Sequence, residues 1–206
     1  MSRLLLLALV VGVAGADVAR SAGAETYTYD RRLGVVARAA LAQASPKTPF
    51  RFVLRAYVRC YRDKRSFEEA YTRRSGESAR RVVAYYAGDG DVHLRNGTCQ
   101  SVRAFLAGRR TVYTAGAFSI LLHEALHRQG VRNERTTTCL ANDVVRWGAG
   151  WLGSGEAQSL RARNLAFTYT RLFAPRSYRM GTPDCLALAR RKDWPAFTRG
   201  GAAAER

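Results

Sequence analysis

The segment from Thr114 to Gly130 constrains the fold most, because its residue pattern predicts a helix that is packed deep in the core. Large apolar residues recur on a wide face of this helix: Phe118, Leu121, Leu122, Ala125 and Leu126. Gly130 is expected to end the helix, since glycine readily adopts the left-handed conformation found at helix C-termini. Other elements must therefore cover this helix on several sides.

The same helix contains the pattern His-Glu-x-x-His, formed by His123, Glu124 and His127. Positions i and i+4 share one face of a helix, so both imidazoles can bind one metal ion. Glu124 lies one position round from the first histidine, where it can hold a metal-bound water and accept its proton. The chain has 3 histidines, and two of them are in this motif. The pattern predicts a zinc site with Glu124 as the catalytic base.

A catalytic zinc ion usually has three protein ligands, so one more is needed. In a continuous helix Glu134 would lie about 10 Å along the axis from His127, which is too far for a shared ion. A left-handed turn at Gly130 would bring the chain back and direct Glu134 at the zinc. We predict Glu134 as the third ligand, with His93 and Asp143 as alternatives. Otherwise His93 is expected to be an exposed strand residue, and Asp143 an outer-sphere or surface carboxylate.

The predicted site implies a hydrolytic mechanism. Zinc lowers the pKa of its bound water to about 7, so hydroxide is available near neutral pH. Glu124 would activate this water as a general base and pass the proton to the leaving amine. Tyr178 or Tyr169 could donate a hydrogen bond to the negative charge that develops on the carbonyl oxygen.

The N-terminus has the features of a signal peptide. A basic residue, Arg3, precedes an apolar run from Leu4 to Val13 that is too short to span a bilayer as a helix. Cleavage is expected after Ala16 or Ala24. We predict a signal peptide over residues 1–24, a single domain over residues 25–198 and a flexible tail over residues 199–206. The protein would then be secreted or located in the cell envelope.

Export makes disulfides the natural state of the four cysteines, none of which is in a C-x-x-C pair. Four cysteines allow three connectivities. We predict Cys60–Cys99, which would attach an early strand to the end of a hairpin, and Cys139–Cys185, which would attach the helix after the motif to the C-terminal segment.

The net charge of +18 comes from 34 Lys and Arg against 16 Asp and Glu. This balance could favour anionic partners such as cell-wall polymers, lipid headgroups or nucleic acid. The basic residues are spread along the whole chain, however, and no nucleic-acid motif accompanies them. We therefore interpret the charge mainly as compositional bias, with at most weak binding to anionic surfaces and no specific nucleic-acid partner.

The remaining pattern predicts an α+β fold with a small sheet before the motif helix and helices after it. Alternating residues favour a strand over 52–61, and a hairpin is expected over 80–95 around a Gly-Asp-Gly-Asp turn. Further helices are expected over 30–44, 66–74, 99–107, 134–147 and 154–173. The first of these helices could also belong to a short propeptide.

The sequence His123-Glu124-Ala125-Leu126-His127 resembles the zincin metallopeptidases. The run Asn133-Glu134-Arg135, followed by Cys139-Leu140-Ala141, resembles small gluzincin-like proteins in which a glutamate opens the helix after the motif. Exported actinobacterial proteins with the same arrangement are also similar. Where gluzincins often have an acidic residue four positions after this glutamate, the chain has Thr138, and Asn133 stands where metzincins place a third histidine.

The resemblance implies zinc bound by His123, His127 and Glu134, with Glu124 as general base. It also implies that the hairpin over 85–95 holds a peptide substrate as an added strand. We therefore expect an exported zinc-dependent metallohydrolase that cleaves peptide bonds. The alternatives are a non-catalytic envelope or binding protein that contains zinc, and a basic protein that binds anionic cell-surface polymers.

Overall fold

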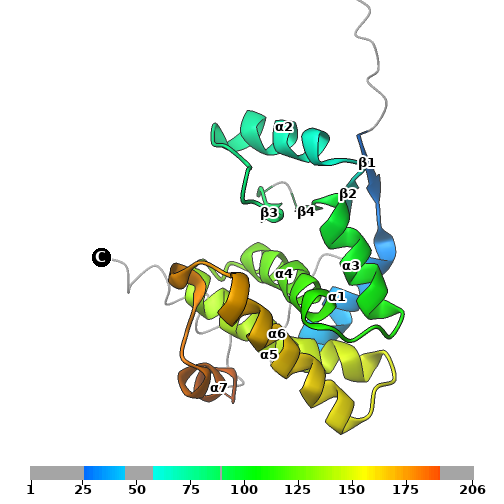
Figure 1. Cartoon of the computed structure of the whole chain (residues 1–206), viewed down its shortest axis with the longest axis vertical. Coiled ribbons are helices and arrows are strands. Elements are labelled where there is room, and N and C mark those ends of the chain that lie inside the picture. The colour runs from blue at the N-terminus through cyan, green and yellow to red at the C-terminus, as the bar shows by residue number, and fades with distance from the viewer. Residues whose placement is uncertain (1–25, 45–57, 89, 191–206) are drawn as a thin grey trace, which may run out of the picture.

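The computed structural model describes residues 26–44, 58–88 and 90–190. Within these residues the chain forms one four-stranded sheet and seven α-helices, which confirms the predicted α+β class (Figure 1). The strands are β1 (Tyr27–Tyr29), β2 (Val58–Tyr61), β3 (Ala84–Tyr86) and β4 (Val92–Leu94). The helices are α1 (Arg31–Ala44), α2 (Lys64–Ser75), α3 (Asn96–Leu106), α4 (Val112–Arg128), α5 (Glu134–Trp151), α6 (Glu156–Phe173) and α7 (Thr182–Arg190), with a short 3-10 helix η1 (Arg176–Tyr178). The predicted signal peptide and C-terminal tail, and the first part of the predicted strand over 52–61, lie outside the described residues.

The sheet is mixed and has the strand order β1-β2-β4-β3, so β3 is an edge strand. The predicted hairpin is present, because β3 and β4 pair antiparallel, while β2 pairs parallel with β4. Side chains alternate between the two faces of the sheet. Val58, Cys60 and Leu94 face the main core, whereas Tyr61 and Tyr85 pack with Phe67 of α2 on the opposite face. The sheet therefore separates α2 from the helical part of the molecule (Figure 1).

Helix α4 is the predicted motif helix, and it lies in the core as expected. Phe118, Leu121, Leu122 and Leu126 have no exposed surface. The helix begins two residues earlier than predicted, because Thr111 and Thr114 form a reciprocal capping box at its N-terminus. Helices α1, α3, α5 and α6 and strand β3 all contact it. Because α1 packs against α4 and α5, it is part of the domain core.

Several other predicted helix boundaries are wrong by a few residues. Helix α2 is capped by Asp63 and not by Ser66, because the Asp63 carboxylate accepts a hydrogen bond from the Ser66 backbone N–H at 2.8 Å. Helix α3 begins at Asn96, three residues before the predicted start at Cys99. Helix α5 continues to Trp151, four residues beyond the predicted end, and α6 starts at Glu156, two residues after the predicted Ser154.

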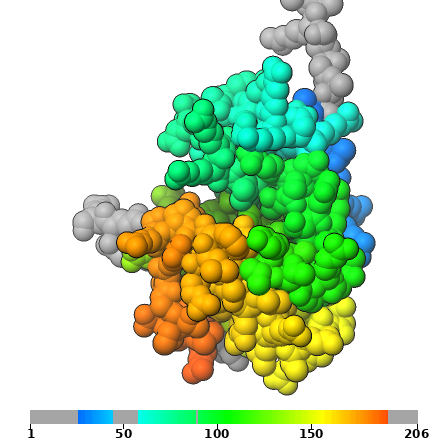
Figure 2. All heavy atoms as spheres, in the orientation of Figure 1, coloured from blue at the N-terminus to red at the C-terminus, as the bar shows by residue number. Residues whose placement is uncertain are grey.

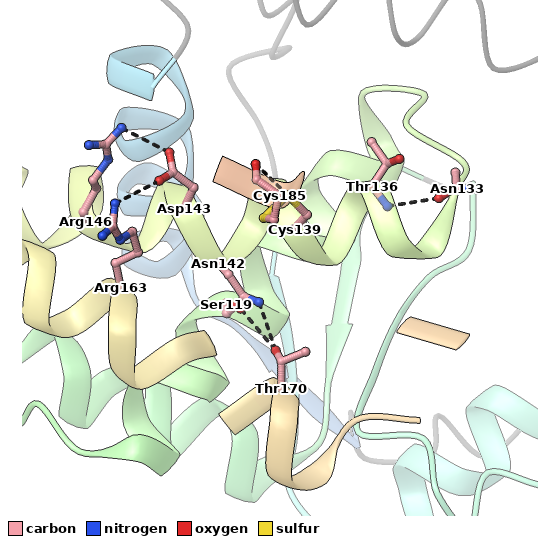
Figure 3. Close-up of a disulfide and its surroundings, with 10 residues drawn as sticks. All are labelled: Ser119, Asn133, Thr136, Cys139, Asn142, Asp143, Arg146, Arg163, Thr170 and Cys185. Atoms are coloured by element: carbon pink, nitrogen blue, oxygen red, sulfur yellow. Dashed lines mark hydrogen bonds and ion pairs between the residues drawn. A yellow bond between two sulfur atoms is a disulfide. The ribbon is translucent and has the colours of Figure 1, made fainter. Parts of the chain in front are cut away.

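Both predicted disulfides are confirmed: Cys60–Cys99 connects β2 to α3, and Cys139–Cys185 connects α5 to α7. The second disulfide is shown in Figure 3, where α7 lies against α5. Helix α7 and η1 were not predicted, and neither was β1. In the described part of the chain, no helix combines the length and the apolar character that crossing a membrane requires.

Candidate metal centre

The side chains of His123, His127 and Glu134 converge on one point beside α4. The Nε2 atoms of the two histidines are 2.8 Å apart, and the Glu134 carboxylate lies 2.9 Å from His123 Nε2 and 3.4 Å from His127 Nε2. The three ligand atoms lie within 4.8 Å of one another, and the group could hold a metal ion. The structure therefore brings together the three residues that were predicted as ligands.

The turn after α4 brings Glu134 back to the histidines, as the sequence predicted. Gly130 has φ 91°, in the left-handed region. The Gly130 N–H donates to the His127 carbonyl, and the Val131 N–H donates to the Leu126 carbonyl. This hydrogen-bond pattern is a Schellman motif, which reverses the chain at the end of a helix. Asn133 then caps α5 by accepting from the Thr136 N–H, and Glu134 is the first residue of that helix.

Each histidine is oriented by a second partner at its Nδ1 atom. His127 Nδ1 is 2.7 Å from the Val131 carbonyl oxygen, which can only accept, so His127 donates from Nδ1 and, in its neutral form, keeps a lone pair on Nε2. His123 Nδ1 is 3.1 Å from the Thr138 hydroxyl. Such partners fix the tautomer and the ring direction of metal-binding histidines. Both Nε2 atoms consequently point at the same site.

Glu124 lies beside this group without belonging to it. Burial raises the pKa of the Glu124 carboxyl above its usual range, although the charges of His123 and His127 oppose the shift. The Tyr86 backbone N–H of the edge strand also opposes the shift, and by less than the two histidines do. A buried carboxylate with a raised pKa next to a ligand cluster is suited to accept and return a proton.

The ligands themselves interact strongly. Burial alone would raise the pKa of Glu134, but hydrogen bonds from His123 and His127 lower it to about 2. Burial alone would lower the pKa of His127, but its hydrogen bond with Glu134 and the nearby charge of Glu124 raise it. Both shifts arise because the imidazoles and the Glu134 carboxylate lie against one another.

Neither of the alternative third ligands, His93 and Asp143, is at the site. The surroundings of both residues differ from those expected. His93 is not exposed: only 2% of its surface is accessible, and its ring stacks on Tyr85 on the α2 face of the sheet. Asp143 is not at the surface either, because it is buried and pairs with Arg146 and Arg163 (Figure 3). The alternation of side chains along β4 directs His93 away from α4.

Of the two candidate tyrosines, Tyr178 lies next to the ligands. Its ring is nearly parallel to that of His123, with 5.8 Å between the ring centroids. Burial and the charge of Glu134 raise the pKa of Tyr178, so its hydroxyl remains a donor at neutral pH. Tyr169 lies in α6, before η1 in the chain, and packs against Gly116. Thr138 lies one turn after Glu134 on α5, and this spacing is the sequence signal that could have indicated its contact with the site.

Two pockets lie on either side of the motif residues and together form a cleft. One pocket lies between α4, α6 and the segment before β3, and the other lies between the end of α2, β3 and the ligand cluster. Both include Ala84, Glu124 and Tyr178, so the two pockets meet at the catalytic candidate. In the space-filling view, the orange segment containing the end of α6 and η1 faces the segment of α2 and β3 across a hollow (Figure 2).

Comparisons of the chain with protein-family models, with curated proteins and with solved structures find no match. The geometry of this site is therefore the basis for assigning a function.

Proposed function

We propose that the protein is an exported zinc-dependent metallohydrolase, a peptidase of the zincin type in which Glu124 is the general base. The observation that carries the proposal is the convergence of His123, His127 and Glu134, with the Glu124 carboxyl adjacent but outside the ligand group. A site built only to bind a metal needs the three ligands. The additional carboxyl, held at the mouth of two pockets, supports a reaction.

The donor set suits zinc. Two imidazole nitrogens and one carboxylate, with a position left for water, are typical of catalytic zinc sites. A zinc ion bound there would act as a Lewis acid and make a bound water acidic near neutral pH. Thr138 and the Val131 carbonyl would hold the two imidazoles in the ligating orientation.

The chain's own residues would carry the proton and stabilise charge. Glu124 accepts a proton from the attacking water and delivers it to the leaving amine, and its raised pKa brings it closer to the pH at which both transfers occur. Tyr178, whose ring lies beside His123, donates a hydrogen bond to the oxygen on which negative charge develops.

The edge strand β3 offers a place where an extended peptide substrate can bind. Tyr85 pairs with His93 in the hairpin register, and the Arg95 N–H donates to the Val83 carbonyl. In an antiparallel pair the intervening residues direct their backbone groups away from the partner strand. Ala84 therefore presents its N–H and C=O along the cleft, where an extended peptide can add as a further strand.

Export is supported by the N-terminal residue pattern and by the two disulfides. Disulfides persist in oxidising compartments, which a cleaved signal peptide would allow the protein to reach.

The proposal is tested with purified wild type and Glu124→Gln. We expect about one zinc per chain in both proteins by metal analysis. Cleavage of a broad peptide library should fall about 10²–10⁴-fold in the variant, because a general base contributes a factor of this size. Equal background cleavage by both proteins with zinc retained would indicate the non-catalytic zinc protein. Absence of zinc from the wild type would favour the basic polymer-binding protein.

A further inference from the structure

The pocket between α4 and α6 has a volume of about 310 Å³ and reaches His123 and Glu124. This size is at the lower end of the range for small-ligand sites, which is about 300–1,000 Å³, so it suits one or two side chains better than a long segment. Its position places any side chain bound there next to the bond that Glu124 would help to cleave. Its lining should therefore influence which peptides are cut.

The lining is mainly apolar. Apart from the motif residues His123 and Glu124, Arg81 is the one charged residue among the described residues that line it, and Arg81 is exposed. Most other positions carry aliphatic or aromatic side chains, among them Val82, Ala84, Ile120, Tyr169, Phe173 and Pro175. Apolar walls favour an apolar side chain and penalise a charged one, which would lose its hydration without a partner.

One wall of the pocket is formed by Tyr169 and Phe173 of α6, which we call the aromatic wall. A Cβ atom at position 116 would lie 2.1 Å from Tyr169 Cγ, so only glycine on α4 allows this ring to lie against the helix backbone. The centroids of the Tyr169 and Phe173 rings are 5.1 Å apart, and the Tyr113 ring stacks on Phe173 with 5.5 Å between the centroids. Phe173 is 51% exposed and Tyr113 63% exposed, so the wall continues onto the surface as an apolar patch.

Buried hydrogen bonds hold the aromatic wall in position. The Ser119 hydroxyl donates to Asn142 Oδ1 at 2.7 Å, and Asn142 Nδ2 donates to the Thr170 hydroxyl at 3.0 Å (Figure 3). These bonds connect α4, α5 and α6 directly behind the pocket, and Thr170 is adjacent to Tyr169. The pocket is thus preformed, which reduces the entropy lost when a side chain binds.

The pocket on the other side of Glu124 differs in character. Its lining includes the polar groups of Tyr71, Arg74 and Ser75 at the end of α2. A peptide that crosses the site meets an apolar pocket on one side of the cleaved bond and a more polar one on the other. From this asymmetry we infer that the α4–α6 pocket recognises a large apolar side chain of the substrate, at one fixed position beside the cleaved bond. The inference rests on the proposed peptidase function.

The first test is cleavage of a mixed peptide library by the zinc-loaded full chain, with cut sites identified by mass spectrometry. We expect Leu, Ile, Met, Phe or Tyr at one position next to the cut. For matched peptides with Leu or Ala at that position, kcat/KM should differ about tenfold or more. Cleavage without a preference at any position next to the bond would overturn the inference and leave the peptidase function intact.

Matched variants test whether the α4–α6 pocket causes the preference for Leu over Ala. Phe173→Ala removes part of the aromatic wall and should reduce the Leu/Ala ratio several-fold, because half-exposed Phe173 is not needed for the core. Ile120→Phe should fill the pocket and shift the preference towards Ala. Leu172→Ala is the control, since Leu172 is the neighbouring exposed residue on α6 and does not line the pocket. A Leu172→Ala effect equal to that of Phe173→Ala would contradict the assignment.

A binding measurement separates the pocket from catalysis. Two peptide hydroxamates that differ only in a Leu or Gly side chain are titrated into zinc-loaded wild type and Glu124→Gln. The Leu compound should bind about tenfold more tightly to both proteins, and Ile120→Phe should remove the difference. Retained preference without any cleavage would reject the peptidase and keep the pocket. Equal affinities, or no binding of either compound, would overturn the inference.

Discussion

The chain places its three histidines in two buried clusters that differ in what the imidazoles face. On α4, the Nε2 atoms of His123 and His127 face each other and the Glu134 carboxylate. In β4, His93 stacks on Tyr85 with 4.4 Å between ring centroids, and its Nδ1 is 3.0 Å from the Tyr61 hydroxyl. All three are at least partly buried, so burial alone does not distinguish a ligand from a packing residue.

The difference between the two clusters comes from convergence. Helical i, i+4 spacing directs two imidazoles to one face, and the Gly130 turn adds a carboxylate to the same point. A single histidine in a strand has a neighbour from the adjacent strand, which here is an aromatic ring. The first cluster collects lone pairs that can bind a cation, whereas the second uses the imidazole as an aromatic and hydrogen-bonding group inside a small core.

The largest expected effect is on zinc binding. His123→Ala removes one of three ligands, so its zinc affinity should fall by more than the 10–100-fold that loss of an outer partner typically causes. His93→Phe keeps an aromatic ring in the second cluster and should retain about one zinc per chain. Elemental analysis of the two purified variants measures the contrast. Full zinc content in folded His123→Ala, or its loss from folded His93→Phe, would remove the distinction between the clusters.

A smaller effect is expected at Thr138, which orients His123 without being a ligand. Thr138→Val keeps the shape of the side chain but removes the hydroxyl 3.1 Å from His123 Nδ1. Zinc affinity should fall about tenfold, at the lower end of the outer-partner range. Competition with a chromophoric chelator measures this affinity. Thr168→Val is the matched control, because the exposed Thr168 hydroxyl donates to the Asn164 carbonyl of its own helix. If the two variants bind zinc equally well, Thr138 has no orienting role.

The smallest effect is the pH dependence of the metal-free protein. The lowered pKa of Glu134 gives stability that is complete above its ordinary value of 4.5 and is lost as the pH falls towards about 2. The raised pKa of His127 gives stability that is complete below its ordinary value of 6.5 and is lost as the pH rises beyond it. The Glu134–His127 interaction should therefore contribute most between about pH 4.5 and pH 6.5.

Denaturant unfolding of chelator-treated wild type and Glu134→Gln from pH 3 to pH 8 measures this window. The free energy difference between the two proteins should be greatest inside it and decline on both sides. Glu156→Gln, the same substitution on the exposed first turn of α6, is the control. A difference that does not change with pH would show that the two side chains do not interact in the metal-free protein.

Much of the site could be predicted because its parts are close together in the sequence. The site spans only 12 residues, from 123 to 134, and both the helix spacing and the glycine turn are local properties. The helix boundaries were less accurate, since they depend on which nearby side chain caps the first turn. Helix α2 is capped by Asp63, whose carboxylate accepts hydrogen bonds from the Ser66 backbone N–H and from the Ser66 hydroxyl.

The surroundings of His93 and Asp143 were predicted wrongly because they depend on distant residues. His93 is buried by Tyr61, Tyr85 and α2, which the chain brings together only when the sheet forms. Asp143 lies in α5 and is buried, and Arg163 of α6 pairs with its carboxylate. Neither the tyrosines around His93 nor Arg163 beside Asp143 could be recognised from the residues next to these positions.

Local sequence patterns were enough to predict the motif helix, the Gly130 turn and the three converging residues. These follow from backbone periodicity and from a left-handed turn that glycine allows. The folded structure was needed to place Tyr178 beside His123, the Thr138 hydroxyl at His123 Nδ1, and the aromatic wall along one side of the cleft. Those features require α6 and η1 to pack against α4, and packing between elements far apart in the chain is fixed by the complete core, not by local spacing.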